Sequence, residues 1–277
     1  MTNKIYTATG CSRCSIAKRY MADNAINYEE YDIKAEGKQA FSQFYRANRS
    51  KIYRSKDGVE FPVFTNGQTI RQGLGPIISY LIANGQLDGF ISTGTLHGQW
   101  LDGIDISGGD PDQSEDLLHL LSFLKQNGLK LQMTTDGHNA KLFETIVNKD
   151  LCDRAIMAVR GPFDLYKYLS SSPIEETELI NNLKLVSQCP EYQFFTTISV
   201  IPTSDGARYL TPDEVRRTSK TISDATGSKK HPYQIKRFDD TQLDDAAGQK
   251  LEPLQDTAMF KYRTAARRYM VMAEIEN

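Results

Sequence analysis

The sequence predicts an α/β protein with two domains, the first at residues 1–86 and the second at residues 87–277. Its length of 277 residues exceeds that of one typical domain. The chain opens with a strand–helix–strand pattern, and from about residue 86 the rhythm changes to longer strand-then-helix units. These observations predict a small α/β domain followed by a larger one with a parallel sheet or barrel.

The first domain is predicted from short segments of alternating and helical apolar spacing. Residues 4–9 alternate as a strand does, and Asn66-Gly67 is a strong signal for a hairpin turn. A second hairpin, at residues 51–59, is expected to turn at Lys56-Asp57-Gly58. The other predicted elements are strands at 28–33, 61–64 and 68–70 and helices at 14–23, 35–48 and 75–83.

The second domain is predicted as strands alternating with helices, which in a parallel sheet cross over between neighbouring strands. Thr211-Pro212-Asp213-Glu214 is typical of a helix start, with a threonine cap, an early proline and acids in the first turn. A polar segment at 239–255 precedes a final predicted helix at 257–272. The strands are expected at 103–107, 130–135, 154–159, 195–201 and 233–238, and the other helices at 114–126, 140–147, 174–187 and 211–225.

Composition and charge argue against several classes of function. Hydrophobic residues at 39% and charged residues at 25% are ordinary for a globular protein, and no apolar run is long enough for a membrane helix. The net charge of -2 gives no global field that would attract nucleic acid. The first residues lack the pattern of a secretory signal, so we expect a cytoplasmic protein with no nucleic-acid or membrane partner.

The four cysteines fall into one close pair and two separate residues. Cys11 and Cys14 form a C-x-x-C motif between a predicted strand and a predicted helix, which is typical of redox chemistry or metal binding. Cys152 and Cys189 stand alone, far from each other along the chain. Isolated cysteines are most often small buried apolar residues, so the sequence assigns both a structural role.

The pair at Cys11 and Cys14 suits thiol–disulfide exchange. Unpaired N–H groups and the dipole at a helix N-terminus stabilise the thiolate of Cys11, which would attack. Cys14, one turn further, would resolve the mixed disulfide, and Arg13 would add positive potential. The alternative is half of a zinc site, but neither the lone cysteines nor the histidines have the spacing of two further ligands. We therefore expect no metal site.

The segment around Pro62 adds a family resemblance. Phe61-Pro62-Val63-Phe64-Thr65-Asn66-Gly67, a turn containing Gly73 and the C-x-x-C helix follow in the order of the glutaredoxin family, which this chain resembles over residues 3–84. The resemblance implies a thioredoxin-like fold, a cis proline that faces the cysteines, and substrate binding by Arg13, Phe61, Pro62 and Gly73. Ser12-Arg13 replaces the family's usual proline-aromatic dipeptide, and an enlarged segment at residues 51–60 precedes the proline, which favours a dedicated partner.

A glycine-rich strand end carries a second resemblance. Residues 104–107 form an apolar strand that ends in Gly108-Gly109-Asp110-Pro111, where backbone can approach a ligand. Together with Thr134-Thr135-Asp136-Gly137 and a later strand ending in Ile-Pro, this run resembles radical S-adenosylmethionine enzymes over about residues 89–239. The resemblance implies a partial (β/α) barrel. Residues 90–101, where that family holds an iron–sulfur cluster, contain no cysteine, so cleavage of S-adenosylmethionine is not expected.

Three interpretations of the second domain stay open at this point. Gly108, Gly109 and Asp110, with Arg160 as a carboxylate partner, would bind S-adenosylmethionine or a related nucleotide without cleaving it. The domain would otherwise be a scaffold that docks a protein partner. In the third interpretation the glycines only form a tight turn and Arg160 is a surface charge.

The sequence thus predicts a thiol–disulfide oxidoreductase that acts on a protein disulfide or a glutathione mixed disulfide, with a dedicated protein partner. It is expected to require no cofactor, with glutathione as a candidate co-substrate and S-adenosylmethionine as a candidate ligand. The alternative is a non-catalytic cofactor- or partner-binding assembly protein built on a degenerate radical-S-adenosylmethionine fold.

Overall fold

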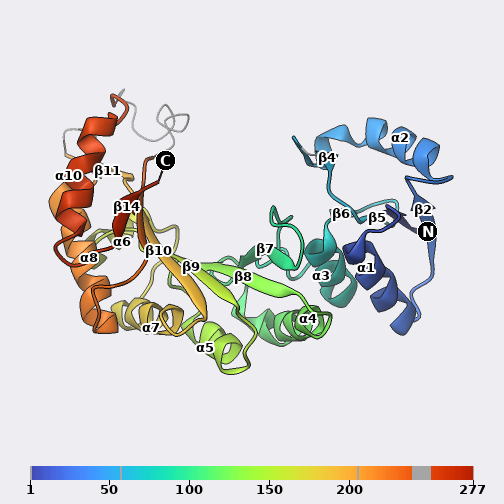
Figure 1. The fold of residues 1–277 in the computed structure, drawn as a ribbon, viewed down its shortest axis with the longest axis horizontal. Helices are drawn as coiled ribbons and strands as arrows, with labels where there is room; N and C mark the ends of the chain where they lie inside the picture. The colour runs from blue at the N-terminus through green and yellow to red at the C-terminus, as the bar shows by residue number, and fades with distance from the viewer. Residues whose placement is uncertain (1, 57, 205, 239–250, 277) are drawn as a thin grey trace. The chain divides into compact units, whose positions relative to one another are not determined.

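The structure is a computed structural model that describes residues 2–56, 58–204, 206–238 and 251–276 (Figure 1). By compactness the chain divides into an N-terminal unit, Met1–Leu131, and a C-terminal unit, Gln132–Asn277. The sequence pattern instead ends the first domain at residue 86. Compactness and chain pattern are different properties, so the domain limits of 1–86 and 87–277 stay a prediction.

The N-terminal unit begins with a four-stranded mixed sheet in the order β2-β1-β5-β6. β1 pairs parallel with β2 and antiparallel with β5, and β5 pairs antiparallel with β6. A separate short hairpin, β3 with β4, precedes β5. The strands are β1 (Asn3–Thr7), β2 (Tyr28–Asp32), β3 (Arg54–Ser55), β4 (Gly58–Val59), β5 (Val63–Thr65) and β6 (Ile70–Gln72), and the helices are α1 (Ser12–Asp23), α2 (Lys38–Ala47) and α3 (Leu74–Ala83).

The core of this sheet is built around its two central strands, β1 and β5. Ile5 and Val63 are fully buried, and Phe64 is buried against the ring of Tyr80 on α3. On β1, Tyr6 is nearly as buried, and its ring stacks on Phe44 of α2. Burial of each such side chain contributes about 1.5–3 kcal/mol, so β1 and β5 fix the frame from which the cysteine motif and the Phe61-Pro62 segment extend.

Residues 87–131 complete the N-terminal unit with β7 (Trp100–Asp105), a 3-10 turn at Pro111–Gln113 and α4 (Ser114–Gln126). The buried residues of α4 repeat at positions i, i+3, i+4 and i+7, which is the stripe of an amphipathic helix. They are Leu117, Leu120, Leu121 and Leu124. This predicted helix begins and ends where the sequence indicates.

The second sheet has six strands in the order β14-β13-β10-β9-β8-β7, and all pairs from β8 to β14 are parallel. The division between the two units falls inside β8. The strands after β7 are β8 (Lys130–Thr135), β9 (Arg154–Ala158), β10 (Glu191–Thr197), β13 (Tyr233–Lys236) and β14 (Ala273–Ile275), with a separate hairpin of β11 (Val200–Thr203) and β12 (Gly206–Tyr209). The helices of the C-terminal unit are α5 (Ala140–Asn148), α6 (Tyr166–Leu169), α7 (Glu176–Val186), α8 (Pro212–Thr226) and α10 (Asp256–Ala266).

The predicted α/β class and its parallel sheet are confirmed, whereas the finer families, a thioredoxin-like domain and a partial barrel, stay predictions. Thr211 caps α8 as expected, because its hydroxyl accepts from the Glu214 N–H while the Glu214 carboxylate accepts from the Thr211 N–H. The strand expected at 195–201 instead begins at Glu191 and ends at Thr197. The polar segment at 239–255 and the hairpin turn at Asp57 fall largely or partly outside the described residues.

None of the helices among the residues described is long and apolar enough to cross a membrane.

Candidate functional site

The first candidate site lies at the N-terminus of α1 in the N-terminal unit. Cys11 is the N-cap residue, with extended backbone, and its Sγ accepts a hydrogen bond of 3.1 Å from the Cys14 N–H. Helix N-termini carry unpaired amide donors and a partial positive charge, which favour a thiolate over a thiol. Cys11 is half-buried, whereas Cys14 is only 2% exposed, and the two are joined by a disulfide. The more accessible sulfur is therefore the one placed at the helix terminus.

The Phe61-Pro62 segment lies beside this cysteine. The Phe61 carbonyl oxygen is 3.9 Å from Cys11 Sγ, and the Phe61–Pro62 peptide is cis. The Gly73 N–H donates to the Pro62 carbonyl over 2.9 Å, and Gly73 has a φ of +85°, which glycine adopts without strain. The structure thus brings Cys11, Cys14 and Phe61 together and links Gly73 to the same segment.

Arg13, between the two cysteines, is bound by its own chain. Its Nη1 lies 2.6 Å from Glu60 Oε1 in a part-buried ion pair. Its Nη2 donates to the carbonyl oxygens of Leu96 and Trp100, both at 2.6 Å. The side chain predicted to contact substrate therefore holds the segment before Pro62 and residues 96–100 beside the motif.

Glu60 was not predicted as a site residue, because in the sequence it is simply one polar residue of the enlarged segment 51–60. Burial raises the pKa of Glu60, and this outweighs the opposing charge of Arg13. Its side chain also lines a pocket of about 280 Å³ together with Tyr53, Ser55, Lys56, Gly58, Gly94, Thr95 and His97. Because Glu60 directly precedes Phe61, this pocket adjoins the segment that contacts Cys11.

The predicted cofactor loop at Gly108-Gly109-Asp110 is filled by its own chain. A Cβ on Gly109 would lie 2.2 Å from the ring of Phe90, and a Cβ on Gly108 would lie 2.5 Å from the Gly89 carbonyl oxygen. The Asp110 carboxylate accepts from the Asp112 N–H and caps the 3-10 turn. A larger side chain at either glycine would therefore clash with the chain itself. Cofactor binding here stays a prediction.

Arg160, the fourth residue of that predicted set, belongs to the C-terminal unit, where it joins the carboxyl-edge cluster: Asp136, His138 and Arg160. Asp136 directly follows β8, and Arg160 lies two residues after β9. Parallel strands place such residues at one edge of a sheet, where α/β proteins commonly bind ligands. Arg160 Nη2 is 2.8 Å from Asp136 Oδ2, and His138 Nδ1 is 2.6 Å from Asp136 Oδ1.

The carboxyl-edge cluster shifts the pKa of its histidine. Burial acts to lower the pKa of His138, but the hydrogen bond and charge of Asp136 outweigh it, and the pKa is raised. The other ring nitrogen lies 3.1 Å from the Pro173 carbonyl oxygen. Asp136 thus contacts both the Arg160 guanidinium and the His138 ring, and the second contact is an ion pair when the histidine is protonated.

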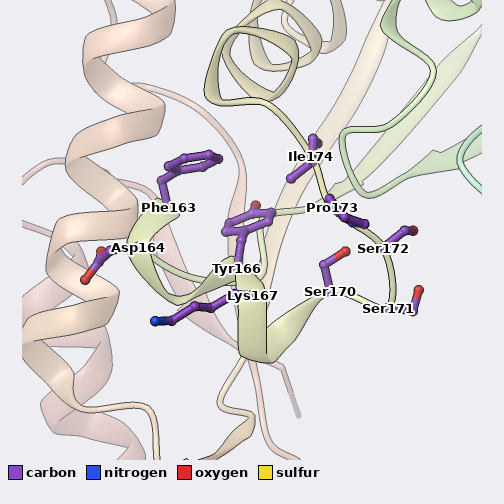
Figure 2. Close-up of a pocket in the computed structure, with 9 residues that line it drawn as sticks. All are labelled: Phe163, Asp164, Tyr166, Lys167, Ser170, Ser171, Ser172, Pro173 and Ile174. Carbon is purple, nitrogen blue, oxygen red and sulfur yellow. The ribbon is translucent and has the colours of Figure 1, made fainter.

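A pocket of about 460 Å³ lies next to this cluster (Figure 2). It is connected to the cluster through Pro173 and through Tyr166, whose hydroxyl oxygen accepts from the Arg160 N–H over 3.3 Å. The Ser170 Oγ is buried and has no hydrogen-bond partner. The lining residues are Phe163, Asp164, Tyr166, Lys167, Ser170, Ser171, Ser172, Pro173 and Ile174.

No protein-family model and no curated protein matches this sequence. A domain of pyruvate-formate lyase-activating enzyme from Bacteroides vulgatus has a TM-score of 0.45 at 12% identity, over 64% of this chain and 100% of that chain. Coproporphyrinogen III oxidase from Escherichia coli, described as a radical SAM enzyme, has a TM-score of 0.43 at 12% identity, over 63% and 40%. Both scores are too low to establish a shared fold.

The glutaredoxin resemblance stays a prediction. The comparison corrects one expectation. The protein was expected to require no cofactor. One of the structures found is described as a radical SAM enzyme, and we withdraw that expectation.

An iron–sulfur cluster nevertheless does not fit this chain's donors. Cluster ligation needs thiolates, and residues 90–101 contain none. Cys11 and Cys14 are joined to each other. Within the described parts of the chain, no group of three or more histidine, cysteine, aspartate or glutamate side chains is placed to hold a metal ion.

Proposed function

We propose that the N-terminal unit carries out thiol–disulfide exchange, with Cys11 as the attacking sulfur and Cys14 as the resolving sulfur. The observation that carries the proposal is the placement of a half-buried Cys11 sulfur at the N-terminus of α1, in a disulfide with the buried Cys14. The amide group that donates to Cys11 Sγ would equally stabilise its thiolate in the reduced form.

The exchange would proceed in two displacements from the reduced dithiol. The Cys11 thiolate attacks one sulfur of a substrate disulfide, a bond forms between them, and the other substrate sulfur leaves as a thiolate and takes up a proton. Cys14 then loses its proton and attacks the Cys11 sulfur, which releases the second substrate thiol. The product is the Cys11–Cys14 disulfide, and an external dithiol or two thiols reverse the steps.

A protein disulfide or a glutathione mixed disulfide is the proposed substrate class. The Phe61 carbonyl beside Cys11 offers a main-chain acceptor to an approaching peptide N–H. Arg13 is engaged with Glu60, Leu96 and Trp100, so it would orient this segment and not contact the substrate. The pocket beside Glu60 would receive the partner's neighbouring side chains, which favours a dedicated partner.

The test is to trap the mixed disulfide. The full chain with Cys14→Ser is incubated with oxidised glutathione, and its intact mass is measured against Cys11→Ser as the matched control. We expect one glutathione adduct, on Cys11, in the Cys14→Ser protein and none on Cys14 in the control. Equal labelling of both variants, or labelling of neither, would reject the assigned roles.

A second candidate function is ligand binding in an assembly protein, and the carboxyl-edge cluster beside the Figure 2 pocket favours it. The probe is S-adenosylmethionine, measured as a shift in the melting temperature of wild type and of Arg160→Ala, each against itself without ligand. A rise in wild type that Arg160→Ala loses would support the candidate. No rise at millimolar ligand would remove this ligand from consideration.

A further inference from the structure

The C-terminal unit contains a second close pair of cysteines. Cys152 and Cys189 lie 37 residues apart in the sequence, yet their Sγ atoms are 3.9 Å apart. Both are buried, at 4% and 5% exposure, and neither is in a disulfide. The sequence-based view of two isolated structural cysteines is therefore wrong in one respect: they are neighbours.

Strand register explains why they meet. Arg154 begins β9 and Glu191 begins β10, and these two residues are partners in the parallel pairing. Each cysteine precedes its strand by two residues, so the pair lies at the same level of the two chains. Neighbouring strands are about 4.8 Å apart, within the window of about 4.4–6.8 Å between Cα atoms that a disulfide requires.

The two strand starts are also tied together by polar contacts. The Glu191 N–H donates to the Asp153 carbonyl oxygen over 3.1 Å, and Arg154 Nε lies 2.8 Å from Glu191 Oε2. Arg154 Nη1 further donates to Gln132 Oε1 over 3.1 Å. These contacts hold together the two backbone segments that directly follow the cysteines, which keeps the sulfurs opposite each other.

The surroundings of Cys152 and Cys189 favour reaction of their thiols with a small oxidant. Gln188 and Pro190, on either side of Cys189, are exposed, so the pair lies directly beneath a surface turn. A hydrogen bond with Cys152 lowers the pKa of the Cys189 thiol, against the burial that raises it. A small opening of this turn would admit a low-molecular-weight oxidant to a thiol that ionises more readily than an isolated buried one.

We propose that Cys152 and Cys189 form a second dithiol–disulfide couple, distinct from Cys11 and Cys14. The oxidant is a low-molecular-weight disulfide, R–S–S–R. The Cys189 thiolate attacks it, forms a mixed disulfide and releases one R–SH. Cys152 then loses its proton and attacks the Cys189 sulfur, which forms the Cys152–Cys189 bond and releases the second R–SH. Two protons and two electrons thus pass from the two cysteines to the small disulfide.

A disulfide between Cys152 and Cys189 would close a loop that forms part of the C-terminal unit. Residues 152–189 include α6, α7 and every residue that lines the pocket in Figure 2. A cross-link between their ends restricts the unfolded chain and so stabilises the native C-terminal unit. The redox state of this pair would therefore set the stability of the segment that forms that pocket.

The experiment uses the full chain with Cys11→Ser and Cys14→Ser, in which Cys152 and Cys189 are the remaining cysteines. The protein is equilibrated with bis(2-hydroxyethyl) disulfide and 2-mercaptoethanol, either folded or during refolding from urea. Remaining thiols are then blocked under denaturing conditions with N-ethylmaleimide, and the protein is digested with trypsin. The matched control carries Cys152→Ala in the same background, which leaves Cys189 with no second cysteine.

We expect a cross-linked species of peptides 150–154 and 185–208 from both starting states, with neither cysteine alkylated. The same oxidised protein should unfold at a temperature several degrees above its reduced form, a difference that the Cys152→Ala control lacks. Two maleimide-blocked thiols even after refolding in the oxidant, or two separate mercaptoethanol adducts, would overturn the proposal. Neither result depends on what Cys11 and Cys14 do.

Discussion

The two cysteine pairs differ in how the fold brings their sulfurs together. Cys11 and Cys14 are three residues apart, and the geometry of one helical turn is sufficient to join them. Cys152 and Cys189 are 37 residues apart, and they meet only because β9 and β10 are neighbours in register. Cysteines that are close in the sequence can be recognised as a pair from their motif, whereas cysteines that are distant in the sequence come together only through strand pairing in the sheet.

Their surroundings differ as much as their spacing. The first pair has a half-buried cysteine at a helix N-terminus and a part-buried ion pair beside it. The second has two sulfurs of equal burial at the amino ends of strands. In the chain-entropy model, closing a loop of this longer span contributes about 4 kcal/mol, against about 2 kcal/mol for the short one. Exchange chemistry thus fits the first pair, and stabilisation fits the second.

The largest expected effect is a difference between the two cysteine pairs in thiol–disulfide exchange activity. Cys11→Ser should reduce the rate of exchange with bis(2-hydroxyethyl) disulfide by roughly 10³-fold or more, because a serine hydroxyl is not ionised at neutral pH and does not replace the thiolate. Cys152→Ala and Cys189→Ala should leave that rate within about twofold, because both thiols are buried and would react with this disulfide only when their surface turn opens, which adds a slow single release of thiol. The rate is followed by mass spectrometry of the product thiol. A large loss in Cys189→Ala would show that the two pairs work as one relay.

The next effect concerns the buried charges beside the first pair. Arg13→Met leaves the Glu60 carboxylate, whose side chain is 14% exposed, without its partner. Removing one partner of a fully buried pair costs about 3–5 kcal/mol, and a slightly exposed pair belongs at or below the lower end of that range. We expect a loss near 3 kcal/mol in urea unfolding, because the already raised pKa of Glu60 lets it take up a proton. The double variant Arg13→Met/Glu60→Gln should recover part of this loss. Equal stability of wild type and Arg13→Met would show that the ion pair does not hold this segment.

Local features of the first site could be predicted from the sequence. A cysteine followed by helical spacing places Cys11 at a helix N-terminus, and the turn residues after Pro62 place the next strand pair. Both depend on residues within one turn or one hairpin. The partners of Arg13 could not be predicted, because Glu60, Leu96 and Trp100 lie 47, 83 and 87 residues away.

The second pair shows where strand boundaries limit prediction. Alternation predicts a strand from residue 195, but β10 begins at Glu191, where polar residues precede the apolar run. With the later start, Cys189 lies six residues before its strand and Cys152 lies two before its own. The observed start gives both the same offset, and only then does parallel pairing bring the sulfurs together.

The smallest effect lies beyond the carboxyl ends of β8 and β9, in the carboxyl-edge cluster. The folded-state pKa of His138 is raised, so its ion pair with Asp136 contributes full stability below the unfolded value of about 6.5 and loses it as pH rises through the folded value. The gap in unfolding free energy between wild type and His138→Gln should therefore be largest at about pH 5.5, on the order of 1 kcal/mol, and shrink by about pH 9.

His231, in the same unit, provides the control of opposite sign. Burial lowers the pKa of His231, whose ring nitrogens contact the hydroxyls of Tyr192 and Thr226. Its contribution is therefore present above the unfolded value and is lost as pH falls through the folded one. The gap between wild type and His231→Gln should narrow toward low pH, whereas the gap for His138→Gln widens. Parallel trends in the two variants would mean that acid stability follows the global charge, and the cluster would then have no separate electrostatic role.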